Sequence, residues 1–391
     1  MALEVLKLRG RGFIALNAHP VGCLEEVRGQ FAVASSIDGP PVPGTALVIG
    51  ASTGYGLASR ICAASAGMST IGVMLERPAQ GTRTASAGWY NTAAFHELAT
   101  GTHRTFNADA FADATKVDVV DAIAALEPAG LLIYSLASPV RTDPDTAELY
   151  KSALKPIGVT HTTRTIDLDR EAIREVTIEP ATDEEIRSTV AVMGGDDLER
   201  WVDALLASGA LRADAAVIAY SYIGPEVTWP IYRHGTVGRA KEHLEVAIAR
   251  VNERMRASGG RAFVSVNKAI ATQASTAIPA VPLYMSLLFK VMKAKDVHEG
   301  AIEQIVRLFD QLGHSGSLNL DADGRLRLDD REMRADIQEA VATLWTVIDT
   351  EHLAMQSDFE GFRRDFHRLF GFDVSGVDYD VAVETDIALP A

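Results

Sequence analysis

The stretch TALVIGASTGYGLASRICAASAG, residues 45–67, decides the fold of this 391-residue chain. Its first residues form an apolar run typical of a strand buried on both faces, and GLASRICAASAG that follows has a helical composition. Gly50, Gly54 and Gly56 stand between the two. A buried strand that leads at once into a helix is typical of a parallel sheet covered by helices.

The same alternation repeats along the chain. Helical stretches at 89–100, 113–128 and 238–257 separate further strand-like runs, at 69–75, 103–110, 131–138, 215–222 and 261–267. The sequence therefore predicts an α/β protein with a Rossmann-like, doubly wound parallel sheet.

The composition limits the partners of the chain. The net charge is −15, which argues against nucleic acid as the main partner, because such a partner requires a basic face. The two cysteines, Cys23 and Cys62, match neither a metal spacing nor a disulfide framework, so we expect a reducing cytoplasm. The uncharged run 269–289 is interrupted by Gln273, Pro279 and Pro282. We interpret it as a loop followed by a buried helix, not as a membrane span.

The glycines after the first strand have the spacing G-x-x-x-G-x-G. Glycine permits a tight turn and lets backbone N–H groups approach a pyrophosphate at a helix N-terminus. Ordinary strand–helix turns also collect glycines, so the loop alone is weak evidence. Glu76 follows the second strand, where an acidic side chain accepts hydrogen bonds from an adenosine ribose and favours NADH over NADPH. A solvated strand end is the alternative for Glu76, and the neighbouring Arg77 would suit a 2′-phosphate.

Further candidate residues follow the later strands. Asp109 and Ala110 come after the third strand, where an adenine usually lies, and Leu136 and Ala137 end the fourth. Since ligands of such sheets bind at the carboxyl ends of the strands, we expect these residues to surround one crevice.

A phenol and an ammonium share the segment IYRHGTVGRAK, residues 231–241. The phenol of Tyr232 has an ordinary pKa of about 10, and a nearby Lys241 ammonium would lower it. Tyr232 would then hydrogen-bond a carbonyl oxygen as it becomes an enolate. The alternative is a half-buried aromatic followed by a solvated cation. Gly235 and Gly238 lie between the two residues, so we expect part of the segment to be a loop.

The chain resembles the trans-2-enoyl-CoA reductases, also described as the long Tyr-x8-Lys type of enoyl-ACP reductase. The resemblance extends from GFIALNAHPVGC (12–23) to FGFDVSGVDYD (370–380). It is carried by GASTGYGLASR (50–60), ERP (76–78), GWYNTAAFH (88–96), YSLASPVRT (134–142), EPAT (179–182), TVAVMGGDD (189–197), the Tyr-x8-Lys segment, KAIATQAS (268–275) and IPAVPLYMSLLFKVMK (278–293).

The resemblance implies NADH-dependent reduction of the 2,3-double bond of an enoyl-CoA or enoyl-acyl carrier protein, in fatty acid biosynthesis, by a cytoplasmic monomer. It implies that Tyr232 is the proton donor, that Lys241 binds the cofactor and that Tyr222 contacts the substrate. The NAD contacts that it implies, besides Lys241, are Gly50, Ala51, Ser52, Thr53, Gly54, Tyr55, Leu75, Glu76, Asp109, Ala110, Leu136, Ala137, Ile270, Ala271 and Thr272.

We expect one enlarged Rossmann-type domain over residues 1–391. Its cofactor core spans about 44–275, with an insertion at 139–213 that contains a helix over Asp197–Ala207. A helical substrate-side and C-terminal region follows at 276–391, with helices at 297–312 and 331–348. The apolar helix near 278–292 either encloses an acyl chain or is plain core. Lys290, Lys293 and Lys295 either meet a CoA phosphate or acidic carrier, or cap that helix.

Two departures from the family pattern lie beside the Tyr-x8-Lys pair. TWPIYRHG (228–235) replaces a more polar stretch, and Glu242 stands where many relatives have a second lysine. They leave open the chain length, the carrier and the rate. A ketoreductase on the same scaffold and an NAD(H)-binding regulator without turnover remain the competing hypotheses. The segment 319–330 nearly matches a calcium loop, but alternating leucines around DADG favour a hairpin turn.

Overall fold

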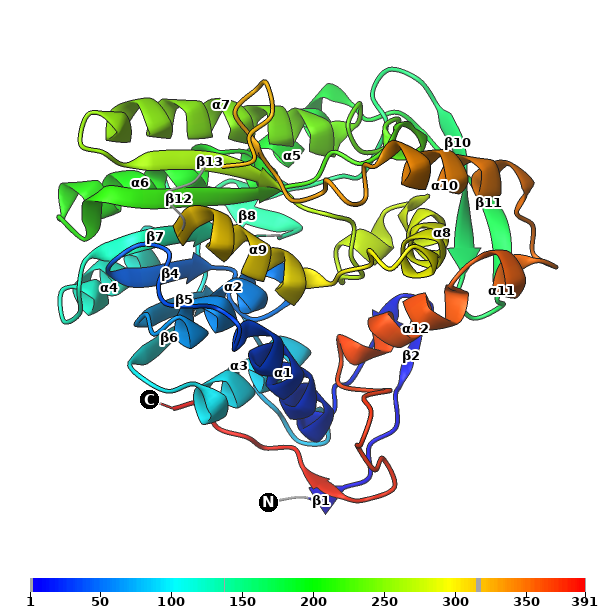
Figure 1. Cartoon of the computed structure of the whole chain (residues 1–391), viewed down its shortest axis with the longest axis horizontal. Helices are drawn as coiled ribbons and strands as arrows, with labels where there is room; N and C mark the ends of the chain where they lie inside the picture. The colour runs from blue at the N-terminus through cyan, green and yellow to red at the C-terminus, as the bar shows by residue number, and fades with distance from the viewer. Residues whose placement is uncertain (1–2, 137, 314–317, 391) are drawn as a thin grey trace.

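A seven-stranded parallel sheet forms the centre of the molecule, in the order β14-β13-β12-β7-β4-β5-β6. The computed structural model describes residues 3–136, 138–313 and 318–390. Figure 1 shows helices on both faces of the sheet. The predicted doubly wound parallel sheet is therefore confirmed.

Six of the seven strands were predicted from their apolar runs. Three of them, β4, β5 and β7, are buried along their whole length, as expected for strands covered on both faces. The seventh, β14, has two residues and was not predicted. The strands are β4 (Thr45–Ile49), β5 (Thr70–Met74), β6 (His103–Asn107), β7 (Ala129–Tyr134), β12 (Leu211–Ser221), β13 (Arg261–Val266) and β14 (Leu326–Arg327).

The strand order reverses between β4 and β7. From β4 the chain proceeds outward through β5 and β6, and then returns to the other side of β4 for β7 and β12. In open α/β sheets ligands bind in the crevice at the carboxyl ends of the strands where the order reverses. The topology therefore places the candidate crevice beyond Ile49 and Tyr134.

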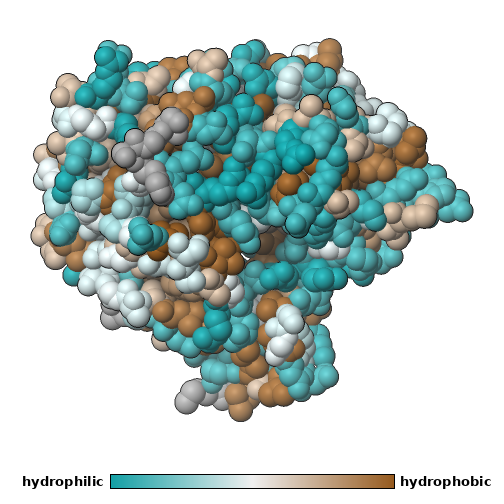
Figure 2. Space-filling view, viewed as in Figure 1, coloured by the Kyte–Doolittle hydropathy of each residue, from teal (hydrophilic) through white to brown (hydrophobic). Residues whose placement is uncertain are grey.

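Two layers of helices cover the sheet. One layer and its core consist of α1 (Pro20–Ala34), α2 (Gly54–Ser65), α3 (Ala87–Leu98) and α9 (Ala301–Gly313). The other consists of α4 (Asp113–Ile123), α6 (Asp196–Ala207) and α7 (Thr236–Arg256). On the face drawn in Figure 2, hydrophilic side chains predominate and apolar ones form scattered groups.

The segment between β7 and β12 folds into small hairpins and two helices. The predicted helix over Asp197–Ala207 is confirmed as α6. Not predicted were β8 (Val140–Thr142), β9 (Leu149–Lys151), the hairpin of β10 (His161–Asp167) and β11 (Ala172–Ile178), and α5 (Asp183–Met193). A capping box of Thr182 and Glu185 starts α5, which packs against α7. The β10–β11 hairpin lies beside α8 and α10 (Figure 1).

The C-terminal region is helical, as predicted. The run 269–289 is a loop with a short 3-10 turn, η2 (Ser275–Ala277), followed by the buried helix α8 (Val281–Ala294). The helices predicted at 297–312 and 331–348 begin later, as α9 and as α10 (Ala335–Val347). Then come α11 (Leu353–Gln356) and α12 (Phe359–Arg368). Within the described residues no helix is both long and apolar enough to cross a membrane.

The turn expected around DADG is present. Leu320 and Leu326 form an antiparallel bridge, and the Asp321 carboxylate accepts backbone N–H groups of Asp323 and Arg325. The same carboxylate pairs with the Arg325 guanidinium at 2.9 Å, so its charge is balanced by a side chain of the protein.

Both ends of the chain meet on one side of the molecule. Strand β1 (Leu3–Glu4) pairs antiparallel with β15 (Val383–Glu384). A second small antiparallel pair is formed by β2 (Gly10–Arg11) and β3 (Ile14–Ala15), and Figure 1 shows β2 beside α12. The tail is also held on α3, because the Trp89 indole and the Tyr90 hydroxyl each donate a 2.7 Å hydrogen bond to a tail carbonyl.

Candidate active site

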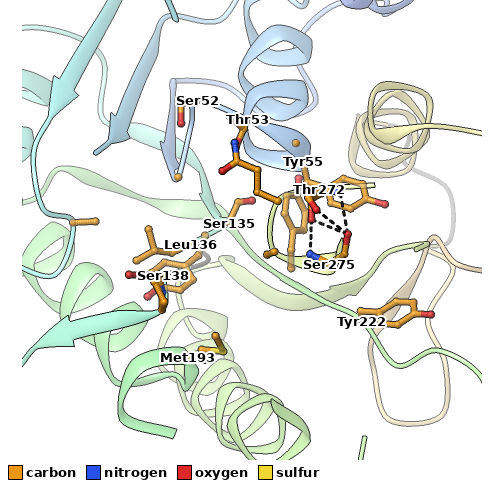
Figure 3. A pocket seen from close by; sticks show the side chains of 18 of the residues that line it. Ser52, Thr53, Tyr55, Ser135, Leu136, Ser138, Met193, Tyr222, Thr272 and Ser275 are labelled. Atoms are coloured by element: carbon orange, nitrogen blue, oxygen red, sulfur yellow. Dashed lines mark hydrogen bonds between the residues drawn. The ribbon is translucent and has the colours of Figure 1, made fainter. Parts of the chain in front are cut away.

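A cavity of about 670 Å³ opens at the carboxyl edge of the sheet, where the strand order reverses. Its wall contains residues that follow β4, β5, β6, β7, β12 and β13, together with Met193 at the end of α5. Figure 3 shows Ser52 and Thr53 on one side of it, with Tyr222 far from Ser138 and Met193. One crevice thus gathers residues that follow six of the seven strands.

In the glycine loop between β4 and α2, the positions of Gly50 and Gly56 have no room for a side chain. Gly50 has a φ of +85°, and a Cβ there would lie 2.5 Å from the Ser135 carbonyl oxygen. A Cβ at Gly56 would overlap the carbonyl oxygen of Gly50. The start of α2 therefore lies directly against the strand end, and Thr53, Gly54 and Tyr55 form cavity wall. A close backbone approach at a helix N-terminus fits the pyrophosphate of a dinucleotide.

Glu76 is held at the cavity wall by hydrogen bonds on both carboxylate oxygens. Oε1 accepts from the Ser52 hydroxyl at 2.6 Å, and Oε2 accepts from the Ser86 hydroxyl at 2.5 Å. Its backbone N–H donates to the Asn107 side chain at 2.7 Å. Since each carboxylate oxygen has two lone pairs, the fixed group still has acceptors for the hydroxyls of a ribose. This is an oriented carboxylate, not a solvated strand end.

A buried ion pair supports the loop that follows β6. The Lys116 ammonium donates to Asp197 Oδ1 at 2.8 Å and to the carbonyl oxygens of Ala110 and Phe111, each at 3.1 Å. Burial raises the pKa of Asp197, and the Lys116 charge acts in the opposite direction. Because Asp197 begins the inserted helix α6, the insertion fixes the position of the predicted adenine loop, Asp109–Ala110.

Tyr232 lies in a turn and Lys241 in a helix. The Tyr232 N–H donates to the Thr228 carbonyl oxygen at 2.9 Å, and α7 begins only at Thr236. The Gly238 N–H donates to the Tyr232 carbonyl oxygen at 2.9 Å, an approach that a Cβ at Gly238 would block. The expectation that part of this segment is a loop is confirmed, and both side chains line the cavity.

One electrostatic expectation was wrong. Lys241 was expected to lower the pKa of Tyr232, but burial raises that pKa instead. The Lys241 ammonium donates to the Tyr220 carbonyl oxygen at 3.1 Å, and burial lowers its own pKa to about 8. Desolvation disfavours the charged phenolate, and the Lys241 charge does not offset this effect. Tyr232 enters the cavity as a neutral phenol, whose hydroxyl has no hydrogen-bond partner among the described residues.

Tyr222 stands beside Tyr232. The two rings meet edge to face, with centroids 5.1 Å apart at an angle of 79°. The Tyr222 hydroxyl donates to Glu332 Oε1 at 3.1 Å, and burial raises the pKa of Tyr222.

The segment after β13 closes the other side of the cavity. The Thr272 hydroxyl and amide donate to the Ser275 hydroxyl oxygen at 3.0 and 2.9 Å, shown as dashed lines in Figure 3. Ala137 lies outside the described residues, and Ala51 and Ala271 do not contribute to the cavity wall. The remaining predicted residues all line it, namely Gly50, Ser52, Thr53, Gly54, Tyr55, Leu75, Glu76, Asp109, Ala110, Leu136, Tyr222, Tyr232, Lys241, Ile270 and Thr272.

Several cavity residues had no predicted role. They include Phe111, Ser138, Met193 and Lys268. From the stretch 278–292 only Ile278 and Val281 reach the cavity, whereas Leu287 and Leu288 pack in the core.

Lys293 and Lys295 pair with Asp358 and Asp336, at 2.6 and 2.7 Å, and do not line the cavity. For these two residues the contacts support the helix-cap interpretation.

Three family models match the chain. They are "NAD(P)H binding domain of trans-2-enoyl-CoA reductase" over residues 5–81, "Trans-2-enoyl-CoA reductase catalytic region" over 83–312 and "Enoyl reductase FAD binding domain" over 320–383.

Curated relatives are similar over nearly the whole chain. The "Trans-2-enoyl-CoA reductase [NADH]" of Ruminiclostridium cellulolyticum is 47% identical, with 96% of this chain and 97% of the relative covered. The "Enoyl-[acyl-carrier-protein] reductase [NADH]" of Flavobacterium johnsoniae is 50% identical, with 96% of each chain covered.

Solved structures have the same fold. The trans-2-enoyl-CoA reductase of Clostridium acetobutulicum in complex with NADH superposes with a TM-score of 0.95 at 40% identity, and 98% of each chain is covered. The Treponema denticola trans-2-enoyl-CoA reductase in complex with NAD gives a TM-score of 0.93 at 44% identity, with 99% of this chain and 100% of that chain covered.

The two cavities at the sheet edge offer no flavin site in the region matched by the third model. The wall of the main cavity contains no residue from 320–383. A smaller cavity of about 50 Å³ lies behind Tyr232 and Lys241, with Arg325 in its wall, and is too small for an isoalloxazine ring. We derive no flavin chemistry from this region.

Proposed function

Since this chain belongs to the trans-2-enoyl-CoA reductase family, we infer that it is an NADH-dependent reductase of trans-2-enoyl thioesters. The substrate is an enoyl-CoA or enoyl-acyl carrier protein, and the 2,3-double bond becomes a single bond. The observation that carries the inference is one cavity that contains both a dinucleotide cradle and the pair Tyr232 and Lys241.

The cradle assigns the parts of NADH to different strands. Backbone N–H groups of Gly50–Tyr55 would hold the pyrophosphate, Glu76 the adenosine ribose, and the Asp109–Ala110 loop the adenine. Leu136, Ala137, Ile270–Thr272 and Lys241 would hold the nicotinamide riboside. NADH, when bound, supplies the hydride equivalent that the reduction consumes.

The side chains of the protein supply the proton and control the charge. Negative charge gathers on the thioester oxygen as the double bond is reduced, and a donor aimed at this oxygen stabilises it. Tyr232 fits that role, because its phenol is neutral and its hydroxyl has no partner among the described residues. Lys241 is a cation in the wall of the same cavity, and Tyr222 is the substrate-side neighbour whose ring packs against Tyr232.

We also propose a cytoplasmic monomer that acts in fatty acid biosynthesis, as the family resemblance implies. Its substrates are small-molecule or carrier-bound thioesters, with no nucleic acid partner, which agrees with the net charge of −15. The buried free thiols of Cys23 and Cys62 suit a reducing compartment. The chain acts as one enlarged domain, with a cofactor core at about 44–275 and a helical substrate-side region at 276–391.

The test is cofactor oxidation followed at the nicotinamide absorbance band. We expect oxidation of NADH with crotonyl-CoA and none with a 3-oxoacyl-CoA. Oxidation with the 3-oxoacyl substrate alone would indicate a ketoreductase. NADH binding without thioester-dependent oxidation would indicate a regulator. A series of longer enoyl-CoAs and one enoyl-carrier protein, each with NADH and NADPH, determines chain length, carrier and cofactor preference.

A further inference from the structure

A fully buried carboxyl lies just outside the cavity. Glu332 belongs to the segment between β14 and α10 and has 0% of its surface exposed. It is absent from the cavity wall, and no family motif in this chain points to it. Burying a carboxyl is costly unless hydrogen bonds compensate, so its contacts require an explanation.

Glu332 accepts three hydrogen bonds from the surroundings of the cavity. Oε1 accepts from the Tyr222 hydroxyl at 3.1 Å and from the Tyr284 hydroxyl at 2.6 Å. Oε2 accepts from the Ala269 N–H at 2.7 Å. One oxygen therefore holds the substrate-side tyrosine, and the other holds the start of the segment that leads into Ile270–Thr272.

One buried cation, Lys268, favours an acceptor at the position of Glu332. Burial raises the pKa of Glu332, and the Lys268 charge is the largest influence in the opposite direction. The Lys268 ammonium donates to the Ala269 carbonyl oxygen at 2.8 Å. Lys268 and Glu332 therefore both hold Ala269, the first residue of the segment 269–272, which we call the cofactor segment. The like charge of Asp329 raises the pKa of Glu332 to a smaller extent.

The contact also determines what Tyr222 can donate. A tyrosine hydroxyl carries one proton, and Tyr222 directs it to Glu332, away from a thioester oxygen. Its ring is meanwhile held edge-on against Tyr232. This arrangement leaves Tyr232 as the donor and makes Tyr222 a support for it.

We propose that Glu332 is a positioning residue of the reaction, which acts through Tyr222 on the orientation of Tyr232 and through Ala269 on the cofactor segment. This inference rests on the proposed reductase function. It also makes the C-terminal region, in which Glu332 lies, a part of the active-site support.

A double-mutant cycle tests the proposal. Glu332→Gln keeps an amide oxygen for the Ala269 N–H but turns an NH₂ group toward the tyrosines. We expect kcat/KM for crotonyl-CoA to fall by about tenfold to a hundredfold, the range for one lost hydrogen bond to a charged group, while the NADH Kd stays within about threefold. In the Tyr222→Phe background, Glu332→Gln should lower kcat/KM by less than about a further twofold. The reason is that the effects of residues that act through one another are not additive.

Glu299→Gln is the matched control. Glu299 is also a buried carboxyl, but its ion-pair partners are Arg307 and Arg331, neither of which lines the cavity, and it acts on the cavity residues Lys268 and Tyr55 only through its charge. We expect it to lower Tm with kcat/KM unchanged. Equal losses from Glu332→Gln in the parent and in the Tyr222→Phe background would overturn the proposal, and so would a Glu332→Gln enzyme with full activity.

Two further measurements keep the test decisive. If Glu332→Gln does not fold, Glu332→Asp, which keeps the acid but shortens its reach, enters the same cycle with the same criteria. If the parent chain shows no turnover, the proposed function fails by itself. The cycle is then measured by calorimetry, as the Kd of crotonyl-CoA for the NAD-bound form of each variant. Coupled effects of the two substitutions on this Kd support the Glu332 inference, and additive effects overturn it.

Discussion

Replacing Tyr232 by Phe removes one hydroxyl from the cavity wall and leaves the ring in place. The ring is held by its edge-to-face contact with Tyr222 and is only 9% exposed. The hydroxyl makes no hydrogen bond to any described residue. Its removal therefore leaves no orphaned partner in the resting protein, and we expect the free energy of unfolding to change by less than about 1 kcal/mol.

The expected effect on the reaction is much larger. If the hydroxyl donates to the thioester oxygen as negative charge develops there, its loss costs about 2.7–4 kcal/mol, or roughly 10² to 10³ in kcat. The NADH Kd should stay within about threefold, because the cradle at Gly50–Tyr55 and Glu76 is untouched. The variant thus separates catalysis from both stability and cofactor binding.

The assay combines steady-state NADH oxidation with crotonyl-CoA, NADH fluorescence titration and thermal unfolding. Tyr90→Phe is the matched control, because Tyr90 is a buried tyrosine away from the cavity whose hydroxyl donates to the Thr385 carbonyl oxygen. We expect this control to lose stability and to keep its kcat. A Tyr232→Phe enzyme with a kcat within about threefold of the parent would refute the assignment of Tyr232 as donor.

Three further predictions concern the cavity wall and the buried ion pair that supports it. Because the pKa of Lys241 is lowered to about 8, its ammonium is lost as pH rises through that value, so the NADH Kd should increase above about pH 8, and Lys241→Met should abolish this dependence. Lys116→Met leaves the Asp197 carboxylate, 1% exposed, without its cation; unfolding by urea should show a loss of about 3–5 kcal/mol, partly recovered by adding Asp197→Leu. Glu76→Gln removes the charge that repels a 2′-phosphate, so the preference for NADH over NADPH in kcat/KM should fall by about tenfold or more; an unchanged ratio would exclude Glu76 from cofactor selection.

The sheet could be predicted because its determinants are local. Runs such as ALVI (46–49) and LLIY (131–134) are apolar throughout, as expected of strands that are buried on both faces. Strand β14 has two residues and takes its place through pairing with β13, so no local pattern identifies it. The β10–β11 hairpin carries charged and polar residues on much of its surface and depends on contacts with α8.

The candidate site likewise has some features that could be predicted from the sequence and others that could not. Gly50, Glu76 and the Tyr232–Lys241 pair follow strands in recognisable spacings, so their gathering at one edge could be expected from the topology. The pKa of Tyr232 could not, because it depends on burial by residues distant in sequence. Glu332 is likewise brought to Ala269 and Tyr222 only by the packing of the C-terminal region against the sheet.

The pairing of β1 with β15 makes the chain nearly circular. A short linker could join the two ends, and new ends could be opened in the exposed turn between β10 and β11, giving a circular permutant with all central strands intact. Conversely, clipping the last residues from Val383 onward would release the first strand from its partner and uncover the face of α3 that bears Trp89. Affinity tags on this protein are therefore best carried by a surface loop on the opposite side.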